Sequence, residues 1–288
     1  MSVNLASRVK RLAGPVMAEI ARWKQTAAMP SKAMAPQKEF RVNRVSTDVS
    51  RTAAVIGGAS LIAATLLFSA VFVYLAHSFG YPAVLDLPAA EVLPRLLALG
   101  PTGRAVWVLY GLIPLLLVPT ALGVYAAGRQ AAPLTARVAV ILALLSAASM
   151  MVGLLRWPSL HWQLALAYAD ASPAAREAIG AVFAASNSYL GNFIGEFLGE
   201  LFLNAFFFSA ALVVARAAGG SRWLVVAGSA VSLLGGMAML RNVVPLVEPI
   251  AALNNAVLPI WMLVFGVVLL LHRNGLHLAS PEPVLART

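Results

Sequence analysis

The sequence predicts an all-α integral membrane protein: a bundle of six transmembrane helices, with interfacial helices on the outer side and a basic N-terminal tail in the cytoplasm. Hydrophobic residues make up 60% of the 288-residue chain and charged residues only 11%, against about 25% charged in an ordinary soluble domain. Apolar stretches of about twenty residues recur along the chain, which is the length that crosses a bilayer as a helix. The basic residues are distributed unevenly around these stretches, as in membrane proteins with a fixed orientation.

Three regions are expected along the chain. Residues 1–50 form a basic cytoplasmic tail and linker, residues 51–273 the membrane domain, and residues 274–288 a short cytoplasmic tail. The six predicted spans are 53–76, 104–128, 137–156, 190–215, 222–241 and 252–272. Strands are not expected, because the apolar runs are long and lack the alternation of a membrane barrel.

The N-terminal tail combines positive charge with helical periodicity. Leu5, Val9 and Leu12 recur at steps of three and four, which predicts an amphipathic helix, and 28–48 are expected to be an extended linker. Three interpretations remain open: a cytoplasmic tail without fixed structure, a helix on the anionic inner leaflet, or a helix that docks a protein partner. Nucleic acid is not expected as a partner, because ten of the 21 Lys and Arg residues lie in this tail and its junction with the first span rather than on a folded domain.

The distribution of Lys and Arg predicts the orientation. Sixteen of these residues fall on the side of the two termini and five on the other side, so both termini are expected in the cytoplasm. Linkers 77–103 and 157–189 then face outward. Each is expected to contain helix, the second of them starting at Ser172 as N-cap and Pro173 at the first helical position.

The fourth span carries an unusual polar pattern, "GNFIGEFLGELFLNAF" at 191–206. Glycine recurs at every fourth position, and a polar series keeps the same step one residue later. The glycines are Gly191, Gly195 and Gly199, and the polar residues are Asn192, Glu196, Glu200 and Asn204. The glycines predict close helix packing. The carboxylates cannot face lipid cheaply, so the fourth span is expected at the centre of the bundle.

The polar stripe has candidate partners at the outer ends of other spans, namely Arg156, Arg241, Asn254 and Asn255. Two interpretations compete. The carboxylates form ion pairs that hold helices together, or they line an outward-open pocket for a small polar or cationic ligand or a proton. Counting residues places Glu196 level with the arginines and Glu200 about one turn deeper, which assigns Glu200 to the pocket.

Enzyme motifs are scarce in this sequence. It has no cysteine, HExxH zinc pair, Walker loop or GxSxG elbow, so no catalytic residue, metal or cofactor is predicted. An acid–base pair of Glu196 and Glu200 would be the one route to enzymatic activity. A binding or transport protein is expected instead, with a non-catalytic accessory or regulatory subunit, docked through residues 1–50, as the alternative.

Three segments carry a resemblance to a known family: "FGYPAVLDLPAAEVL" at 79–93, "LLRW" at 154–157 and "YLGNFIGEFLGELF" at 189–202. They resemble the bacterial multi-pass family known as domain of unknown function 4386, over about residues 50–273. The resemblance implies six helices in a bacterial inner membrane. It implies no activity, so no functional residue is carried over. The lipid bilayer is the expected partner of the membrane domain, and no oligomeric state is predicted.

Overall fold

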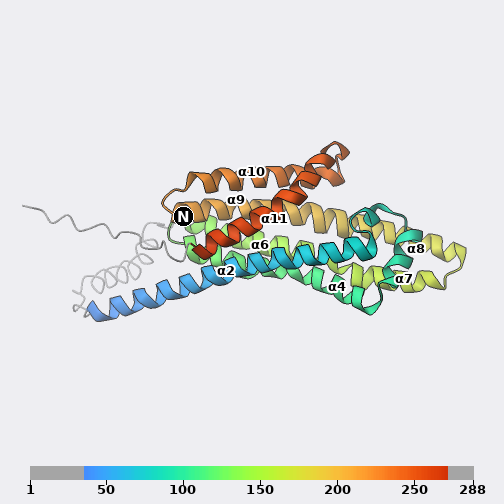
Figure 1. The fold of residues 1–288 in the computed structure, drawn as a ribbon, viewed down its shortest axis with the longest axis horizontal. Helices are drawn as coiled ribbons and strands as arrows, with labels where there is room; N and C mark the ends of the chain where they lie inside the picture. Colours follow the sequence, from blue (N-terminus) through green and yellow to red (C-terminus); the bar gives the residue numbers. More distant parts are fainter. Residues whose placement is uncertain (1–35, 272–288) are drawn as a thin grey trace, which may run out of the picture. The chain divides into compact units, whose positions relative to one another are not determined.

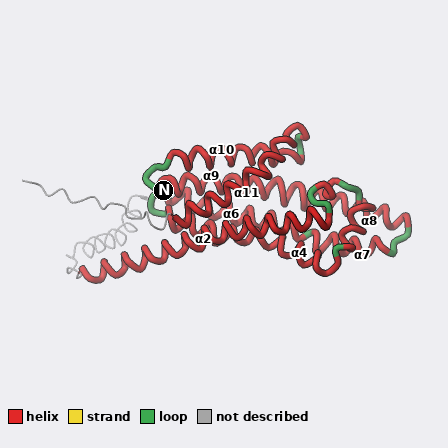
Figure 2. Tube along the Cα trace, in the orientation of Figure 1, coloured by secondary structure: helices red, strands yellow, loops and turns green. Residues whose placement is uncertain are grey.

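The computed structural model describes residues 36–271, with side chains from residue 48 onward. Every regular element in that range is a helix, and the range contains no strand (Figure 2). Six helical stretches are long and apolar enough to cross a membrane. They run Asp48–Phe79, Gly100–Gly128, Pro133–Ala169, Pro173–Ala217, Arg222–Asn242 and Pro245–Leu271. The predicted fold class is confirmed, and the chain is a multi-pass membrane protein.

The first stretch is the part of α2 (Pro36–Phe79) from Asp48 onward, and the other five are built from shorter elements (Figure 1). The second contains α4 (Gly100–Leu112), η2 (Ile113–Leu116) and α5 (Leu117–Gly128). The third contains α6 (Pro133–Leu155), η3 (Trp157–His161) and α7 (Trp162–Ala169). The fourth contains α8 (Pro173–Ser186), η4 (Asn187–Leu198) and α9 (Gly199–Ala217). The fifth contains α10 (Arg222–Ala238) and η5 (Met239–Asn242), and the sixth contains η6 (Pro245–Val247) and α11 (Glu248–Leu271). Two further helices, η1 (Ala83–Asp86) and α3 (Ala89–Ala98), lie between the first and second stretches.

The structure corrects one predicted segment near the N-terminus. Residues 28–48 were expected to be extended, but α2 already begins at Pro36. Proline fits the start of a helix, and neither glycine nor proline follows before Gly57, so nothing in the sequence interrupts the helix. The amphipathic helix predicted in the tail and the C-terminal tail at 274–288 lie outside the described residues.

The third and fourth stretches are longer than the predicted spans. The third continues past Arg156 through η3 and α7 to Ala169. Pro158 does not stop it, because this proline occupies the first turn of η3, where a missing N–H is tolerated. The fourth begins where the capping pattern predicts, with the Ser172 hydroxyl accepting a hydrogen bond from the Ala175 N–H at 3.4 Å.

The fourth stretch is central to the bundle, as its polar residues predict. In its most apolar part 56% of residues are buried, against 28 to 44% in the other five stretches. The main core forms along α9, where Phe206 and Phe207 are fully buried. Helices in a bilayer gain little from excluding water, so close contact and polar bonds hold them together. On α6, the core residues facing this centre are mainly alanines, including Ala139 and Ala143.

A second core lies at the end of the bundle that carries α3, α7 and α8 (Figure 1). This end is called the outer end below, after its predicted side. Trp107 and Trp157 stack there with ring centroids 4.9 Å apart, and Phe79 meets both rings edge-on. Burial raises the pKa of the neighbouring Tyr81 hydroxyl. The aromatic packing fixes the outer ends of α2, α4 and α6, which positions the polar residues beside them.

Candidate functional site

Half of the polar stripe of the fourth stretch lies on a π-helix. The element η4 (Asn187–Leu198) is twelve residues long and contains Asn192 and Glu196, whereas Glu200 lies in the first turn of α9. π-Helices are rare, mostly a single turn long, and frequent at functional sites. Their i→i+5 bonds put more residues into each turn than an α-helix has, so positions four apart stay close to one line. This local geometry keeps the glycines on one side and the polar series beside them.

All three glycines of the stripe face α6. A Cβ atom added to Gly195 would lie 2.8 Å from the Gly153 Cα, so the two backbones touch at this level. A Cβ on Gly199 would lie 2.8 Å from the Met150 side chain, and one on Gly191 would overlap the Arg156 guanidinium. The glycines therefore give α6 room to approach and leave the adjacent polar series free for another partner.

That partner is Arg241, at the outer end of the fifth stretch. Its Nη1 and Nη2 atoms donate to the two carboxylate oxygens of Glu200 at 2.9 and 2.7 Å. The Nη2 atom also donates to Glu196 Oε2 at 2.9 Å. A bidentate arginine–carboxylate ion pair is among the stronger polar contacts in proteins. One arginine is thus shared by two carboxylates, with its side chain 16% exposed.

The depth argument from the sequence is wrong about which carboxylate receives more of the arginine's hydrogen bonds. It placed Arg241 level with Glu196 and a turn above Glu200, yet Glu200 receives two of the three bonds. The reason is the length of the arginine side chain and the position of its backbone in η5, a short 3₁₀ segment beyond the end of α10. From there the guanidinium reaches back along α9, and Nη1 also donates to the Ala238 carbonyl at 3.2 Å.

Asn242 completes this group and was not identified from the sequence. Its amide donates to Glu196 Oε2 at 3.1 Å and to the Asn192 carbonyl at 3.0 Å. Asn192 therefore contributes its backbone oxygen to the site. We refer to Glu196, Glu200, Arg241 and Asn242 as the carboxylate cluster. The one sequence feature that could have identified Asn242 is its position: it is a polar residue directly after Arg241, at the end of a predicted span.

Arg156 does not join the carboxylate cluster, contrary to the ion-pair interpretation of the sequence. It is 5% exposed, and its Nε and Nη2 atoms donate to Asn187 Oδ1 at 3.3 and 2.9 Å. Another bond goes to the Gly153 carbonyl. Within the described residues it has no carboxylate within 4.0 Å. Asn187 was also not identified from the sequence. Its amide donates to the Leu85 carbonyl at 3.3 Å, so Asn187 links Arg156 to the segment that contains Leu85.

The remaining asparagines of the predicted site separate into two groups. Asn204 and Asn254 are buried, at 4% and 2% exposure. The Asn204 amide donates to the Glu200 carbonyl at 2.7 Å, while the side-chain carbonyl oxygens of both asparagines have no partner within the described part of the chain. Asn255 is exposed, so the structure does not bring it into the bundle.

Exposure distinguishes the two carboxylates. The Glu196 side chain is 30% exposed and that of Glu200 15%. Both oxygens of Glu200 are bonded, whereas Glu196 Oε1 accepts no hydrogen bond from residues 48–271. The cluster is therefore a partly open group rather than an enclosed cavity. Within the described ranges, no group of three or more His, Cys, Asp or Glu side chains is arranged to hold a metal ion.

Comparison with known proteins supports the resemblance given by the sequence. The family model described as Domain of unknown function (DUF4386) matches residues 56–271. Neither the curated proteins nor the solved structures gave a match. The matched segment covers about three quarters of the chain and contains the whole carboxylate cluster. The chain therefore belongs to the DUF4386 family.

Proposed function

We propose that this membrane protein binds a small cationic ligand, or a proton, at the carboxylate cluster and carries it inward. One observation supports this most directly: two carboxylates share a single arginine. With both carboxylates ionised, the cluster carries one negative charge more than its bonded arginine neutralises. Uncompensated charge is costly at membrane depth, so such a group favours the arrival of one further positive charge.

Glu196 is the carboxylate that would receive this charge. Its Oε2 atom is held by Arg241 and Asn242, which fixes the orientation of the side chain. Its Oε1 atom is left for a ligand, and 30% of the side chain is exposed. Glu200, bonded through both oxygens, keeps Arg241 in place. These roles reverse the assignment made from the sequence, in which Glu200 was the ligand-facing residue.

The two buried asparagines carry unpartnered oxygens, which the proposal assigns to an inward route for the cation. The unpartnered Asn204 oxygen lies against Gly235, where a Cβ atom would be 2.1 Å from it. Asn204 is one turn inward of Glu200 on α9, and Asn254 supplies a second unpartnered oxygen from α11. Carbonyl and carboxylate oxygens are the usual protein ligands of hard cations. The proposal keeps the expected orientation, in a bacterial inner membrane with both termini in the cytoplasm.

A second candidate function is favoured by the same arginine. The bidentate ion pair of Arg241 with Glu200 is the geometry expected if the cluster has a structural role alone, holding α9 to the end of α10. The protein would then be a non-catalytic accessory or regulatory subunit, docked through residues 1–50. Under this alternative the cluster has no ligand, and the stability of the purified protein does not depend on which cation is present.

Thermal unfolding of the full chain in detergent tests the proposal. The probes are NH₄⁺, Na⁺ and K⁺ at constant ionic strength, together with a pH series from about 5 to 8, because a proton or an ammonium-like cation is the simplest complement of one free carboxylate. A ligand at about 100 times its Kd stabilises the folded state by about 2.7 kcal/mol. We expect one of these cations, or protons, to raise the unfolding temperature of the wild type.

The matched variants are Glu196→Gln and Glu248→Gln. Glu248 is exposed at the first turn of α11, and no described residue forms an ion pair with it. The cation response should disappear in Glu196→Gln and persist in Glu248→Gln. A wild type that responds to none of the probes, or two variants that respond equally, would rule out binding at Glu196 and leave the accessory role ahead.

A further inference from the structure

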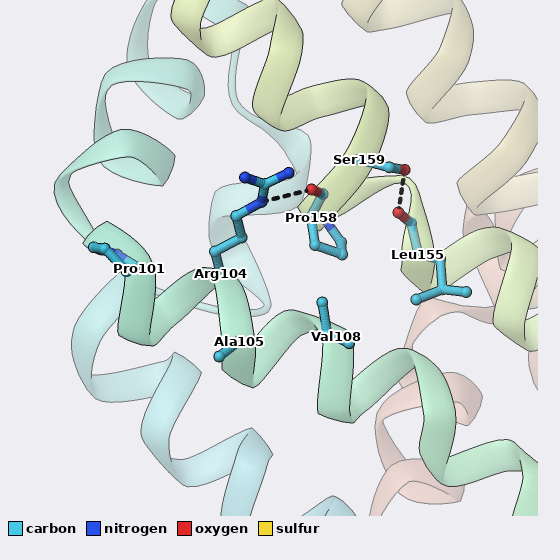
Figure 3. Close-up of a pocket in the computed structure, with 7 residues that line it drawn as sticks. All are labelled: Pro101, Arg104, Ala105, Val108, Leu155, Pro158 and Ser159. Carbon is cyan, nitrogen blue, oxygen red and sulfur yellow. Dashed lines mark hydrogen bonds between the residues drawn. The ribbon is translucent and has the colours of Figure 1, made fainter.

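A groove lies on another face of the protein, between α4 and the junction of α6 with η3 (Figure 3). Its volume is about 620 Å³. The lining residues are Pro101, Arg104, Ala105, Val108, Leu155, Pro158 and Ser159. Arg104 is the only charged side chain among them, and Figure 3 shows its guanidinium group directed toward Pro158, away from Val108. The groove therefore has one charged end and a largely apolar remainder.

Arg104 is held in place but keeps donors free. Its Nε atom donates to the Pro158 carbonyl at 3.0 Å, and its guanidinium carbon lies 5.1 Å from the centre of the Trp162 ring. Its two terminal nitrogens donate no hydrogen bond to any described residue. An arginine fixed in this way presents a planar pair of N–H groups, which is the shape that matches phosphate oxygens.

The position of the groove along the membrane normal fits a lipid. Arg104 is four residues after the start of the second stretch at Gly100, about 6 Å along the helix. It therefore lies near headgroup depth, and Val108 is one turn deeper. Val108 is 39% exposed and Leu109, its neighbour on α4, 43% exposed, so the groove opens onto the apolar surface that faces the bilayer.

We infer that the groove binds one phospholipid of the surrounding bilayer. The phosphate group accepts hydrogen bonds from the free terminal nitrogens of Arg104. One acyl chain follows the groove inward past Ala105, Val108 and Leu155. This interaction differs from ordinary contact with bulk lipid, because a fixed arginine at one end selects the phosphate and the groove orders the chain. It does not depend on the proposed cation site, which is built from η4, α9 and η5.

Photo-crosslinking tests this inference on the full chain. The protein is placed in nanodiscs of digalactosyl diacylglycerol, a lipid without a phosphate group, that contain a small fraction of phosphatidylglycerol with a photoactivatable acyl chain, and labelled peptides are mapped. We expect labelling of the peptides that contain Ala105–Val108 and Leu155. Arg104→Gln should lower that labelling about tenfold, as expected for loss of charge-assisted bonds to a phosphate. Arg95→Gln is the control, because Arg95 is exposed and paired with Glu91 at 3.2 Å.

A second pair of variants keeps Arg104 intact. Val108→Trp fills the groove from an exposed position and should also lower the labelling of the groove peptides. Leu109→Trp adds the same ring one residue away, outside the groove lining, and should leave the labelling unchanged. Equal labelling in wild type, Arg104→Gln and Val108→Trp would show bulk lipid contact only and overturn the inference. So would an equal loss in Arg95→Gln or Leu109→Trp.

Discussion

Replacing Glu200 with Gln should destabilise the protein more than the same change at Glu196. Glu200 accepts two charge-assisted bonds from Arg241, and the neutral amide can keep only one of them. The loss of one such bond with its charge costs about 2 kcal/mol. At Glu196 only Oε2 is bonded, and a Gln carbonyl can accept both of its hydrogen bonds. Its replacement should therefore cost about 1 kcal/mol or less, because it also removes a like charge beside Glu200.

The assay is thermal unfolding of both variants in detergent. For a chain of this size, 1 kcal/mol corresponds to about 2–4 °C, so Glu200→Gln should lower the unfolding temperature by about 4–8 °C. Arg241→Gln should lower it further, because it leaves two neighbouring carboxylates without a cation, a cost of about 3–5 kcal/mol for a buried pair. Double variants then measure the coupling between each carboxylate and each arginine.

The expected coupling pattern is specific to this geometry. Arg241 should couple strongly to Glu200 and weakly to Glu196, and Arg156 should couple to neither, because its bonds go to Asn187 and Gly153. A larger loss in Glu196→Gln than in Glu200→Gln would refute the reasoning. So would strong coupling of Glu200 to Arg156.

Two further predictions concern packing and orientation. Gly195→Ala should cost about 1–3 kcal/mol through overpacking, because the added methyl group meets the Gly153 backbone. Gly236→Ala is the control: no heavy atom lies within 4 Å of the added carbon, so it should leave the unfolding temperature unchanged or raise it slightly through the higher helix propensity of alanine. Single cysteines placed at Ser2 and at Ala174 test the orientation; Ala174 is exposed and does not take part in the Ser172 cap. In spheroplasts, a membrane-impermeant thiol reagent should label position 174 and not position 2. The opposite result would reverse the orientation.

The sequence was sufficient for the helical class and for the order of the spans. Hydropathy and length predict six stretches that can cross a membrane, and the polar stripe predicts that the fourth is the most buried, since carboxylates avoid lipid. Ser172 and Pro173 predict the start of α8, because capping depends only on neighbouring residues. These properties are local to each segment, which is why one sequence can specify them.

The partners of the carboxylates could not be obtained in the same way. Residue counting gives depth but not the rotation of a helix about its axis, and Arg156 and Arg241 lie at similar predicted depths. The π-helix adds to this difficulty, because its turn contains more residues than that of an α-helix and so rotates every later residue about the helix axis. No residue pattern in the sequence predicts it. Asn187 and Asn242 were missed for the same reason: each contributes only because of how its helix is rotated.

The two sides of η4 have different consequences for function. On the glycine side, Gly195 touches the backbone of Gly153, so α6 and η4 cannot slide past each other without losing contact. On the polar side, the bonds come from side chains of η5, a single 3₁₀ turn between α10 and the linker to α11. In the proposed function the cation would bind at Glu196 Oε1 while Arg241 stays bonded to Glu200, so binding would not require η5 to leave the carboxylates.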